Sequence, residues 1–136
     1  MELSTYLNFN GNCEAAFKFY EKALGGKIQF MLKCGDSPMA EQTPANWRDK
    51  VMHSRIELAG KVLMGSDSPP DHYAGNKGFS ISLSFDKPED AERVFKALAA
   101  GAIIGMPLQE TFWARKFGTL TDQFGIPWMI NCEKPE

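Results

Sequence analysis

The sequence has few of the residues that build metal and redox sites. It contains only two histidines and three cysteines, and no two cysteines have the C-x-x-C spacing. Three cysteines cannot all pair within one chain, so we expect free thiols rather than a disulfide framework. No stretch approaches the roughly 20 apolar residues of a membrane span. Residues 1–4 show neither a basic region nor an apolar run, so we expect no signal peptide, no membrane partner and a reducing, cytoplasmic setting.

An excess of positive charge is also missing. Lys and Arg total 15 against 17 Asp and Glu, which gives a formal net charge of -2 at pH 7. A protein that binds nucleic acid through its phosphates needs a basic surface, so we expect no nucleic-acid partner. The 136 residues, 43% of them hydrophobic, are enough for one domain with its own core.

An internal repeat organises the chain. When the sequence is shifted by 76 residues, residues 7–28 align with residues 83–104 at seven identical positions. The identical pairs are Leu7/Leu83, Phe9/Phe85, Ala15/Ala91, Phe19/Phe95, Ala23/Ala99, Gly25/Gly101 and Ile28/Ile104. Each copy consists of an alternating stretch, apolar residues at helical spacing, a glycine and a second strand-like stretch.

Further strands are expected after each helix, which completes two βαβββ modules. The expected strands are residues 5–9, 27–33, 52–58 and 62–66 in the first half and 79–85, 103–106, 113–121 and 128–132 in the second. Asn12 is expected to cap the first helix, and Asp86 with Glu89 resembles a capping box for the second. Glycines should end both helices, and residues 34–50 form a long loop.

The predicted fold class is therefore α+β, with two βαβββ modules forming a cupped mixed sheet and helices on its outer face. We expect residues 1–136 to form a single domain. Module 1 spans about residues 1–66, a linker rich in Pro and Gly spans 67–77, and module 2 spans about 78–132.

Strand alternation assigns the two faces of this sheet. The apolar positions of the first strand of each module should face the helices. The opposite positions are small or polar, and they include Tyr6, Asn8, Ser80 and Ser82. A polar sheet face surrounded by aromatic residues suits the lining of a small-molecule pocket, although a plain solvent-exposed face gives the same pattern.

Two further groups are candidates for the pocket. His53 shares a strand face with Arg55 and Glu57, a combination that suits an acid–base or anion site as well as an ordinary solvated face. Phe112 and Trp113 belong to an aromatic-rich stretch that either lines a pocket or packs in the core.

Two cations and two aspartates complete the set of candidates. Arg115 and Lys116 follow the aromatic stretch, where they would attract an anionic ligand if they lie at the rim of a pocket. Asp67 and Asp122 each stand beside a strand, and Asp122 is interpreted as a turn residue that binds its own backbone.

Several stretches carry a family resemblance. They are residues 6–11, 19–20, 62–67, 106–113, 117–118 and 122–129. These stretches resemble the PhnB-like branch of the vicinal oxygen chelate superfamily, which includes glyoxalase I, fosfomycin and bleomycin resistance proteins, and extradiol dioxygenases. The resemblance implies a ligand inside the cup and a homodimer.

The resemblance also locates the metal ligands of the metal-dependent relatives. The four corresponding positions hold Ser4, Met64, Ser80 and Met129. None of these is a usual ligand for zinc, nickel or iron(II), so we expect neither a metal nor another cofactor. The predicted pocket residues are Tyr6, Asn8, His53, Met64, Ser80, Ser82, Phe112, Trp113 and Met129.

The function that fits these features is binding of a small molecule, of unidentified structure, without a transition metal. Two alternatives remain open: a metal-dependent lyase, transferase or dioxygenase of the same superfamily, and a resistance protein that sequesters a drug or toxin. The sequence assigns no catalytic residue and leaves open whether the protein is an enzyme. Some members of this branch carry a 3-demethylubiquinone methyltransferase label, but no glycine-rich strand-to-helix loop for a methyl donor is present.

Overall fold

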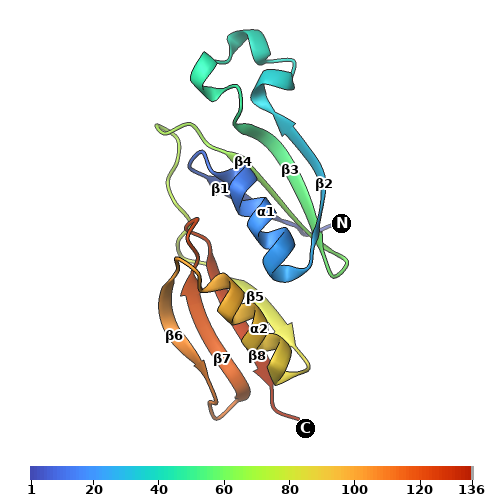
Figure 1. Cartoon of the computed structure of the whole chain (residues 1–136), viewed down its shortest axis with the longest axis vertical. Helices are drawn as coiled ribbons and strands as arrows, with labels where there is room; N and C mark the ends of the chain where they lie inside the picture. Colours follow the sequence, from blue (N-terminus) through green and yellow to red (C-terminus); the bar gives the residue numbers. More distant parts are fainter. Residues whose placement is uncertain (136) are drawn as a thin grey trace. The chain divides into compact units, whose positions relative to one another are not determined.

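The computed structural model describes residues 1–135, and in it the chain forms two compact units (Figure 1). The first unit is Met1–Gly75 and the second begins at Asn76. Each unit has the order βαβββ and contains one four-stranded mixed sheet and one long helix. This confirms the predicted α+β fold of two similar modules. The division between the units falls inside the segment that the sequence assigns to the linker.

The first unit has the strand order β1-β4-β3-β2. Its elements are β1 (Thr5–Phe9), α1 (Cys13–Leu24), β2 (Lys27–Lys33), β3 (Val51–Leu58) and β4 (Lys61–Asp67). β1 runs parallel to β4, and the other neighbours are antiparallel. Between β2 and β3 the chain forms three short 3-10 helices, Cys34–Asp36, Ala40–Gln42 and Ala45–Trp47. The segment predicted as a loop therefore contains local helical turns.

The second unit repeats this topology with the strand order β5-β8-β7-β6. Its elements are β5 (Ile81–Phe85), α2 (Pro88–Leu98), β6 (Ile103–Gln109), β7 (Ala114–Thr121) and β8 (Pro127–Glu133). β6 is longer than predicted and includes Pro107, which an edge strand tolerates because its outer N–H groups need no strand partner. Trp113 lies just outside β7.

Each helix covers one face of the sheet in its own unit (Figure 1). In the first unit Leu7 and Phe9 of β1 are fully buried, as are Phe17 and Tyr20 of α1. The rings of Phe9 and Phe17 pack edge to face with 5.9 Å between their centroids. In the second unit the core contains Val94 and Leu98 of α2, together with Trp128 and Ile130 of β8. Alternation along the strands therefore separates a helix-covered face from an opposite face in both units.

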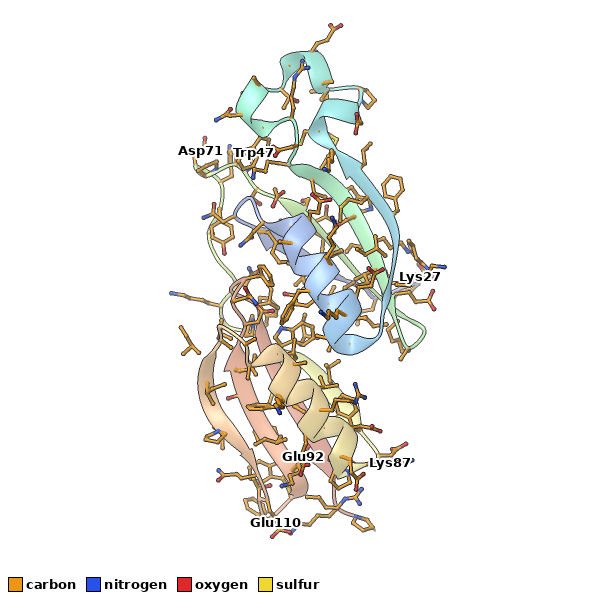
Figure 2. The ribbon with its side chains drawn as sticks, in the orientation of Figure 1. Lys27, Trp47, Asp71, Lys87, Glu92 and Glu110 are labelled. Carbon is orange, nitrogen blue, oxygen red and sulfur yellow. The ribbon has the colours of Figure 1, made fainter. Side chains whose placement is uncertain are left out.

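The helix ends agree with expectation only in part, because α2 ends with Ala99 as its C-cap instead of at Gly101. Gly25 ends α1 with φ 73°, the left-handed conformation that glycine adopts without strain. Asn12 occupies the N-cap of α1, but its side chain forms no capping hydrogen bond. The N-cap of α2 is Lys87, where the chain enters the helix (Figure 2), and it too lacks a side-chain cap. Asn12 therefore holds the predicted N-cap position without a side-chain cap, whereas the predicted capping box at Asp86 is wrong.

No helix within residues 1–135 combines the length and the apolar character needed to cross a membrane.

Candidate functional site

The first sheet has one face that α1 leaves uncovered, and we call it face 1. Its side chains include those of Tyr6, Asn8, Lys27, Phe30, His53, Arg55, Glu57 and Met64. Tyr6 is 43% exposed and Phe30 48% exposed. Aromatic side chains with this exposure on a sheet offer apolar surface to a ligand.

Strand register aligns four of these side chains in one row across face 1. Tyr6 of β1 is opposite Met64 of β4, and Met64 is opposite Arg55 of β3. Arg55 is in turn opposite Phe30 of β2. The pairing skips Gln29 between Ile28 and Phe30, so β2 contains a one-residue bulge there. The row therefore consists of two aromatic rings, a thioether and a guanidinium.

His53 lies between the two aromatic residues of this row. The Tyr6 and His53 rings stack, with centroids 5.8 Å apart and an interplanar angle of 19°. The Tyr6 hydroxyl is also 3.3 Å from His53 Nδ1. The Phe30 ring is 5.8 Å from His53 at a tilt of 48°. These contacts form a continuous ring surface, which sequence reasoning missed because Phe30 was not among its candidates.

The charged side chains of face 1 are linked through one amide. Arg55 Nε donates to Gln29 Oε1 at 3.0 Å, and Gln29 Nε2 donates to Glu57 Oε2 at 2.5 Å. The predicted trio of His53, Arg55 and Glu57 thus shares a face, but Gln29 separates its two charges. The amide engages Arg55 through Nε, which leaves the N–H groups of both terminal Nη atoms for a ligand or for water.

The corresponding face of the second sheet, face 2, is lined mainly by hydroxyl and thioether side chains. Ser82 of β5 is opposite Met129 of β8, and Met129 is opposite Thr119 of β7. A hollow of about 300 Å³ lies here. Its lining residues are Ser80, Ile103, Gly105, Thr119, Leu120, Thr121, Pro127, Trp128 and Met129. The structure therefore brings Ser80 and Met129 together and places Ser82 beside them in the register.

Phe112 and Trp113 lie apart from this hollow, in the connection between β6 and β7. Their rings meet edge to face at 4.7 Å, and Trp113 meets Phe117 at 5.3 Å. Phe112 is 88% exposed. Neither residue lines the hollow, so their assignment to a pocket remains a prediction.

The positions expected for metal ligands offer two hydroxyls and two thioethers, from Ser4, Ser80, Met64 and Met129. Divalent zinc, nickel and iron prefer imidazole, carboxylate or thiolate donors. Within residues 1–135 no three His, Cys, Asp or Glu side chains gather where they could hold a metal ion. The residues present therefore do not fit the metal centre of the metal-dependent relatives.

Arg115 and Lys116, expected at a pocket rim, make structural contacts. Arg115 donates to the backbone carbonyls of Asp86 and Glu133, at 2.6 and 2.8 Å. Lys116 forms a 3.3 Å ion pair with Glu92, whose place on α2 is labelled in Figure 2. These contacts hold Arg115 at the strand ends and Lys116 against α2. Arg115 also lines a hollow of about 400 Å³ in the second unit, so its expected role in anion attraction stays a prediction.

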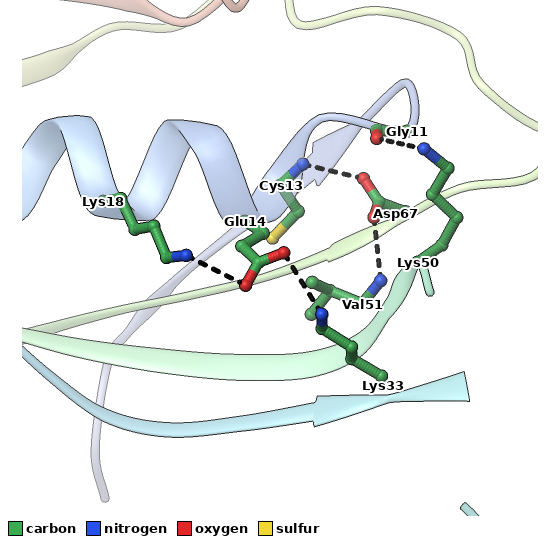
Figure 3. A network of polar contacts seen from close by, with 8 residues as sticks. All are labelled: Gly11, Cys13, Glu14, Lys18, Lys33, Lys50, Val51 and Asp67. Atoms are coloured by element: carbon green, nitrogen blue, oxygen red, sulfur yellow. Dashed lines mark hydrogen bonds and ion pairs between the residues drawn. The ribbon is translucent and has the colours of Figure 1, made fainter. Parts of the chain in front are cut away.

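The two aspartates beside strands are buried acceptors. Asp122 Oδ1 accepts the N–H groups of Phe124 and Ile126, which confirms its role in a turn, and Oδ2 accepts the Trp128 indole N–H. Asp67, at the end of β4, accepts the N–H of Cys13 through Oδ1 and that of Val51 through Oδ2 (Figure 3). Asp67 thereby supplies the cap of α1 that Asn12 does not.

The Cys13 thiol is buried next to this cap. Cys13 Sγ is 3.4 Å from Ser54 Oγ, and the Ser54 hydroxyl donates to the carbonyl of Gly65 at 2.8 Å. Burial raises the pKa of the Cys13 thiol to about 12. Burial also raises the pKa of the Cys34 thiol. Because a thiolate is the nucleophilic form, neither group suits nucleophilic catalysis at neutral pH.

Glu14, in the first turn of α1, has two cationic neighbours. Lys18 and Lys33 approach its carboxylate at 3.2 and 3.3 Å (Figure 3). The hydrogen bond from Lys18 and, after it, contacts with Lys33 lower the pKa of Glu14. This exposed network stabilises the start of the helix.

Comparisons with known proteins agree with this architecture. A family model described as 3-demethylubiquinone-9 3-methyltransferase matches residues 1–131. The chain belongs to this PhnB-like family. The PhnB protein of Bacillus cereus carries the same methyltransferase name. It is 25% identical, with a TM-score of 0.82 over 97% of this chain and 99% of that one.

Two other proteins resemble the PhnB-like chain more closely. Protein PA1353 from Pseudomonas aeruginosa is 49% identical, with a TM-score of 0.90 over 99% of both chains. Protein YjdN of Escherichia coli is 38% identical over 144 residues, which covers 100% of this chain and 98% of YjdN. At 9% and 15% identity, the same fold occurs in a fosfomycin resistance protein from Listeria monocytogenes and in a glyoxylase/bleomycin resistance protein/dioxygenase domain from Frankia.

Proposed function

We propose that this PhnB-like protein binds a small organic molecule on the helix-free faces of its sheets, without a transition metal. The observation that carries the proposal is the row formed by Tyr6, Met64, Arg55 and Phe30 on face 1. Small-molecule sites combine apolar and aromatic surface with a few fixed polar groups. Face 1 has this composition, and the hollow on face 2 adds hydroxyl donors.

The donor chemistry supports binding without a metal. A neutral serine hydroxyl is a weak ligand for a divalent ion, and a thioether suits Cu(I) better than zinc or nickel. His53 is the one imidazole on face 1, whereas a stable site usually takes three protein ligands. Methyl transfer is not part of the proposal, because the strand-to-helix connections, residues 10–12 and 86–87, are short and contain only one glycine, Gly11.

A homodimer in the cytoplasm completes the proposal. The edge strand β6 exposes Ile103, Ile104 and Met106, and apolar side chains on an unpaired edge favour association. The three cysteines are free, in keeping with a reducing compartment. Light scattering at micromolar concentration should give twice the mass of one chain, and the mass of a monomer contradicts the dimer.

The proposed function is tested by elemental analysis and by ligand screening. Protein purified without a His-tag or chelator should contain no stoichiometric zinc, nickel or iron. It should not isomerise the glyoxalase hemithioacetal when zinc, nickel or manganese is added. NMR screening with a metabolite and antibiotic library should find compounds that shift the amide signals of Tyr6, His53, Met64 or Met129. One tightly bound metal per chain with ligands on these faces overturns the proposal, as does a library whose hits all map elsewhere.

A further inference from the structure

We infer that face 1 recognises the carboxylate of a planar organic molecule, with Arg55 binding the anion and the Tyr6–His53 stack supporting the ring. The inference rests on the proposed function and adds the chemical class of the ligand. It follows from a comparison of equivalent positions in the two modules, from the unused donors of Arg55 and from the exposed rings around it.

The two faces differ in charge at equivalent positions. Met64 and Met129 occupy equivalent positions. Met64 is on β4, between β1 and β3, and Met129 is on β8, between β5 and β7. The neighbours of Met64 are Tyr6 and Arg55, whereas those of Met129 are Ser82 and Thr119. A cation therefore stands on face 1 where face 2 has a neutral hydroxyl. The first unit is therefore the one that recognises an ionic group of the ligand.

The guanidinium of Arg55 is positioned but not neutralised. Its Nε is engaged by Gln29, and within residues 1–135 it forms no ion pair. Glu57, the nearest acidic residue along β3, is instead bound by the Gln29 amide. The two Nη groups of an arginine held in this way match the two oxygens of a carboxylate.

The charges around Arg55 favour a single negative charge on the ligand. Lys27 lies opposite Glu57 in the register of β2 and β3, so face 1 holds two cations and one carboxylate near the row. A ligand with one negative charge neutralises the remaining positive charge. The second negative charge of a phosphate ester would meet the Glu57 carboxylate on the same face, which disfavours it.

The rings beside Arg55 set the shape of the ligand. Tyr6 and Phe30 occupy the two ends of the row and are both about half exposed. His53 contacts both rings, with centroid distances of 5.8 Å to each. A flat ring that stacks on this surface removes apolar area from water while its carboxylate reaches the guanidinium. An aromatic or heteroaromatic carboxylate has both parts.

The test uses three matched probes on the full-length protein. They are 2-naphthoate, the neutral 2-naphthamide and 2-naphthyl phosphate, titrated by calorimetry and by amide NMR. We expect 2-naphthoate to bind about tenfold more tightly than the amide, because a charge-assisted bidentate contact is lost. The signals of Tyr6, His53 and Arg55 should shift. Tighter binding of the phosphate ester than of 2-naphthoate overturns the assignment of a carboxylate.

Substitutions identify the anion ligand. Arg55→Gln should lower affinity for 2-naphthoate about tenfold, to that of the amide, and leave the affinity for the amide unchanged. Arg93→Gln makes the same change of charge on an exposed helix position paired with Asp90 and should change neither affinity. Tyr6→Ala should weaken both probes. Arg55→Met, with its melting temperature compared with that of the wild type, serves as a second variant.

Failure of this inference is distinct from failure of the proposed function. Three results overturn the carboxylate assignment. They are equal affinities for 2-naphthoate and the amide, an Arg55→Gln variant with unaltered affinity for 2-naphthoate, and no binding of either probe. Neutral library compounds that shift face 1 signals leave the proposed function standing in each of these cases. A library with no hit on either face overturns both.

Discussion

The indole N–H of Trp128 donates to Asp122 Oδ2 at 2.8 Å, inside the core of the second unit. The same carboxylate accepts two backbone N–H groups of its own turn through Oδ1. Asp122 is 4% exposed and Trp128 is fully buried. One carboxylate therefore joins the β7–β8 turn to the largest side chain of the core.

Asp122→Ala should lower the free energy of unfolding by about 3 kcal/mol, because it leaves buried N–H donors without an acceptor. Asp122→Asn keeps an oxygen for the turn but presents an NH₂ group to the indole, so its loss should be smaller. Urea denaturation measures both values. Equal losses for Ala and Asn would contradict the division of roles between Oδ1 and Oδ2.

Asp67→Ala should destabilise the first unit by about 2–4 kcal/mol, since Cys13 and Val51 both lose the acceptor of their N–H groups. Asn12→Ala is the matched control at the N-cap position. The Asn12 side-chain oxygen is buried and has no hydrogen-bond partner in the described part of the chain. We therefore expect a change below about 0.5 kcal/mol for Asn12→Ala, whereas a capping side chain typically contributes ~1 kcal/mol.

The Cys13 thiol should make stability fall at alkaline pH. Its pKa is about 12 in the folded protein against an ordinary 9.0, so between these values the unfolded chain releases a proton that the folded chain keeps. Stability is fully present below pH 9 and is lost as pH rises, by at most about 1.4 kcal/mol per pH unit. Because the Cys34 pKa is also raised, its thiol contributes in the same direction.

Cys13→Ser removes the first of these titrations and leaves the other ionisable groups in place. Denaturant curves at pH 8 and pH 10.5 should show a smaller alkaline loss for Cys13→Ser than for the wild type. An identical alkaline loss in both proteins would show that Cys13 is not the group responsible. Alkylation of Cys13 at pH 8 should likewise require unfolding.

Gly118→Ala should cost about 1–3 kcal/mol by overpacking. A Cβ at this position of β7 would lie 2.8 Å from the Phe95 ring and 3.0 Å from the backbone of Leu108. Gly25→Ala is the contrasting variant. Nothing lies within 4 Å of a Cβ added at Gly25, so only the φ of 73° opposes the change. We expect about 1 kcal/mol for Gly25→Ala. Thermal melts rank the two, and a larger loss at Gly25 would contradict this account.

The sequence was sufficient where structure depends on neighbours along the chain. The period of two in β1 correctly separates buried Leu7 and Phe9 from exposed Tyr6 and Asn8, and the repeat correctly predicts two modules. The sequence was insufficient where a hydrogen-bond partner lies far away along the chain. The carboxylate that caps α1 comes from Asp67, 54 residues after Cys13, and no local pattern predicts that pairing.

The candidate site shows the same division. Tyr6 was assigned from alternation, and Arg55 was grouped with His53 because they share a strand face. The placement of His53 in the pocket rested on the family resemblance and on composition. Phe30 was missed since the bulge in β2 interrupts alternation, and a bulge has no sequence signature in this strand. The contacts of Arg115 and Lys116 were also not predicted, because the backbone carbonyls and the helix carboxylate that bind them lie elsewhere in the sequence.

The bulge at Gln29 gives this surface an unusual route of evolutionary change. Because Ile28 and Phe30 both keep partners in β3, deletion of this single codon would leave a continuous ladder with Phe30 still opposite Arg55. The deletion would remove the amide that holds Arg55 and Glu57 apart, and the two charges could then pair directly. Among homologues, a strand shorter by one residue here would therefore indicate a changed ligand preference even where every aligned side chain is the same.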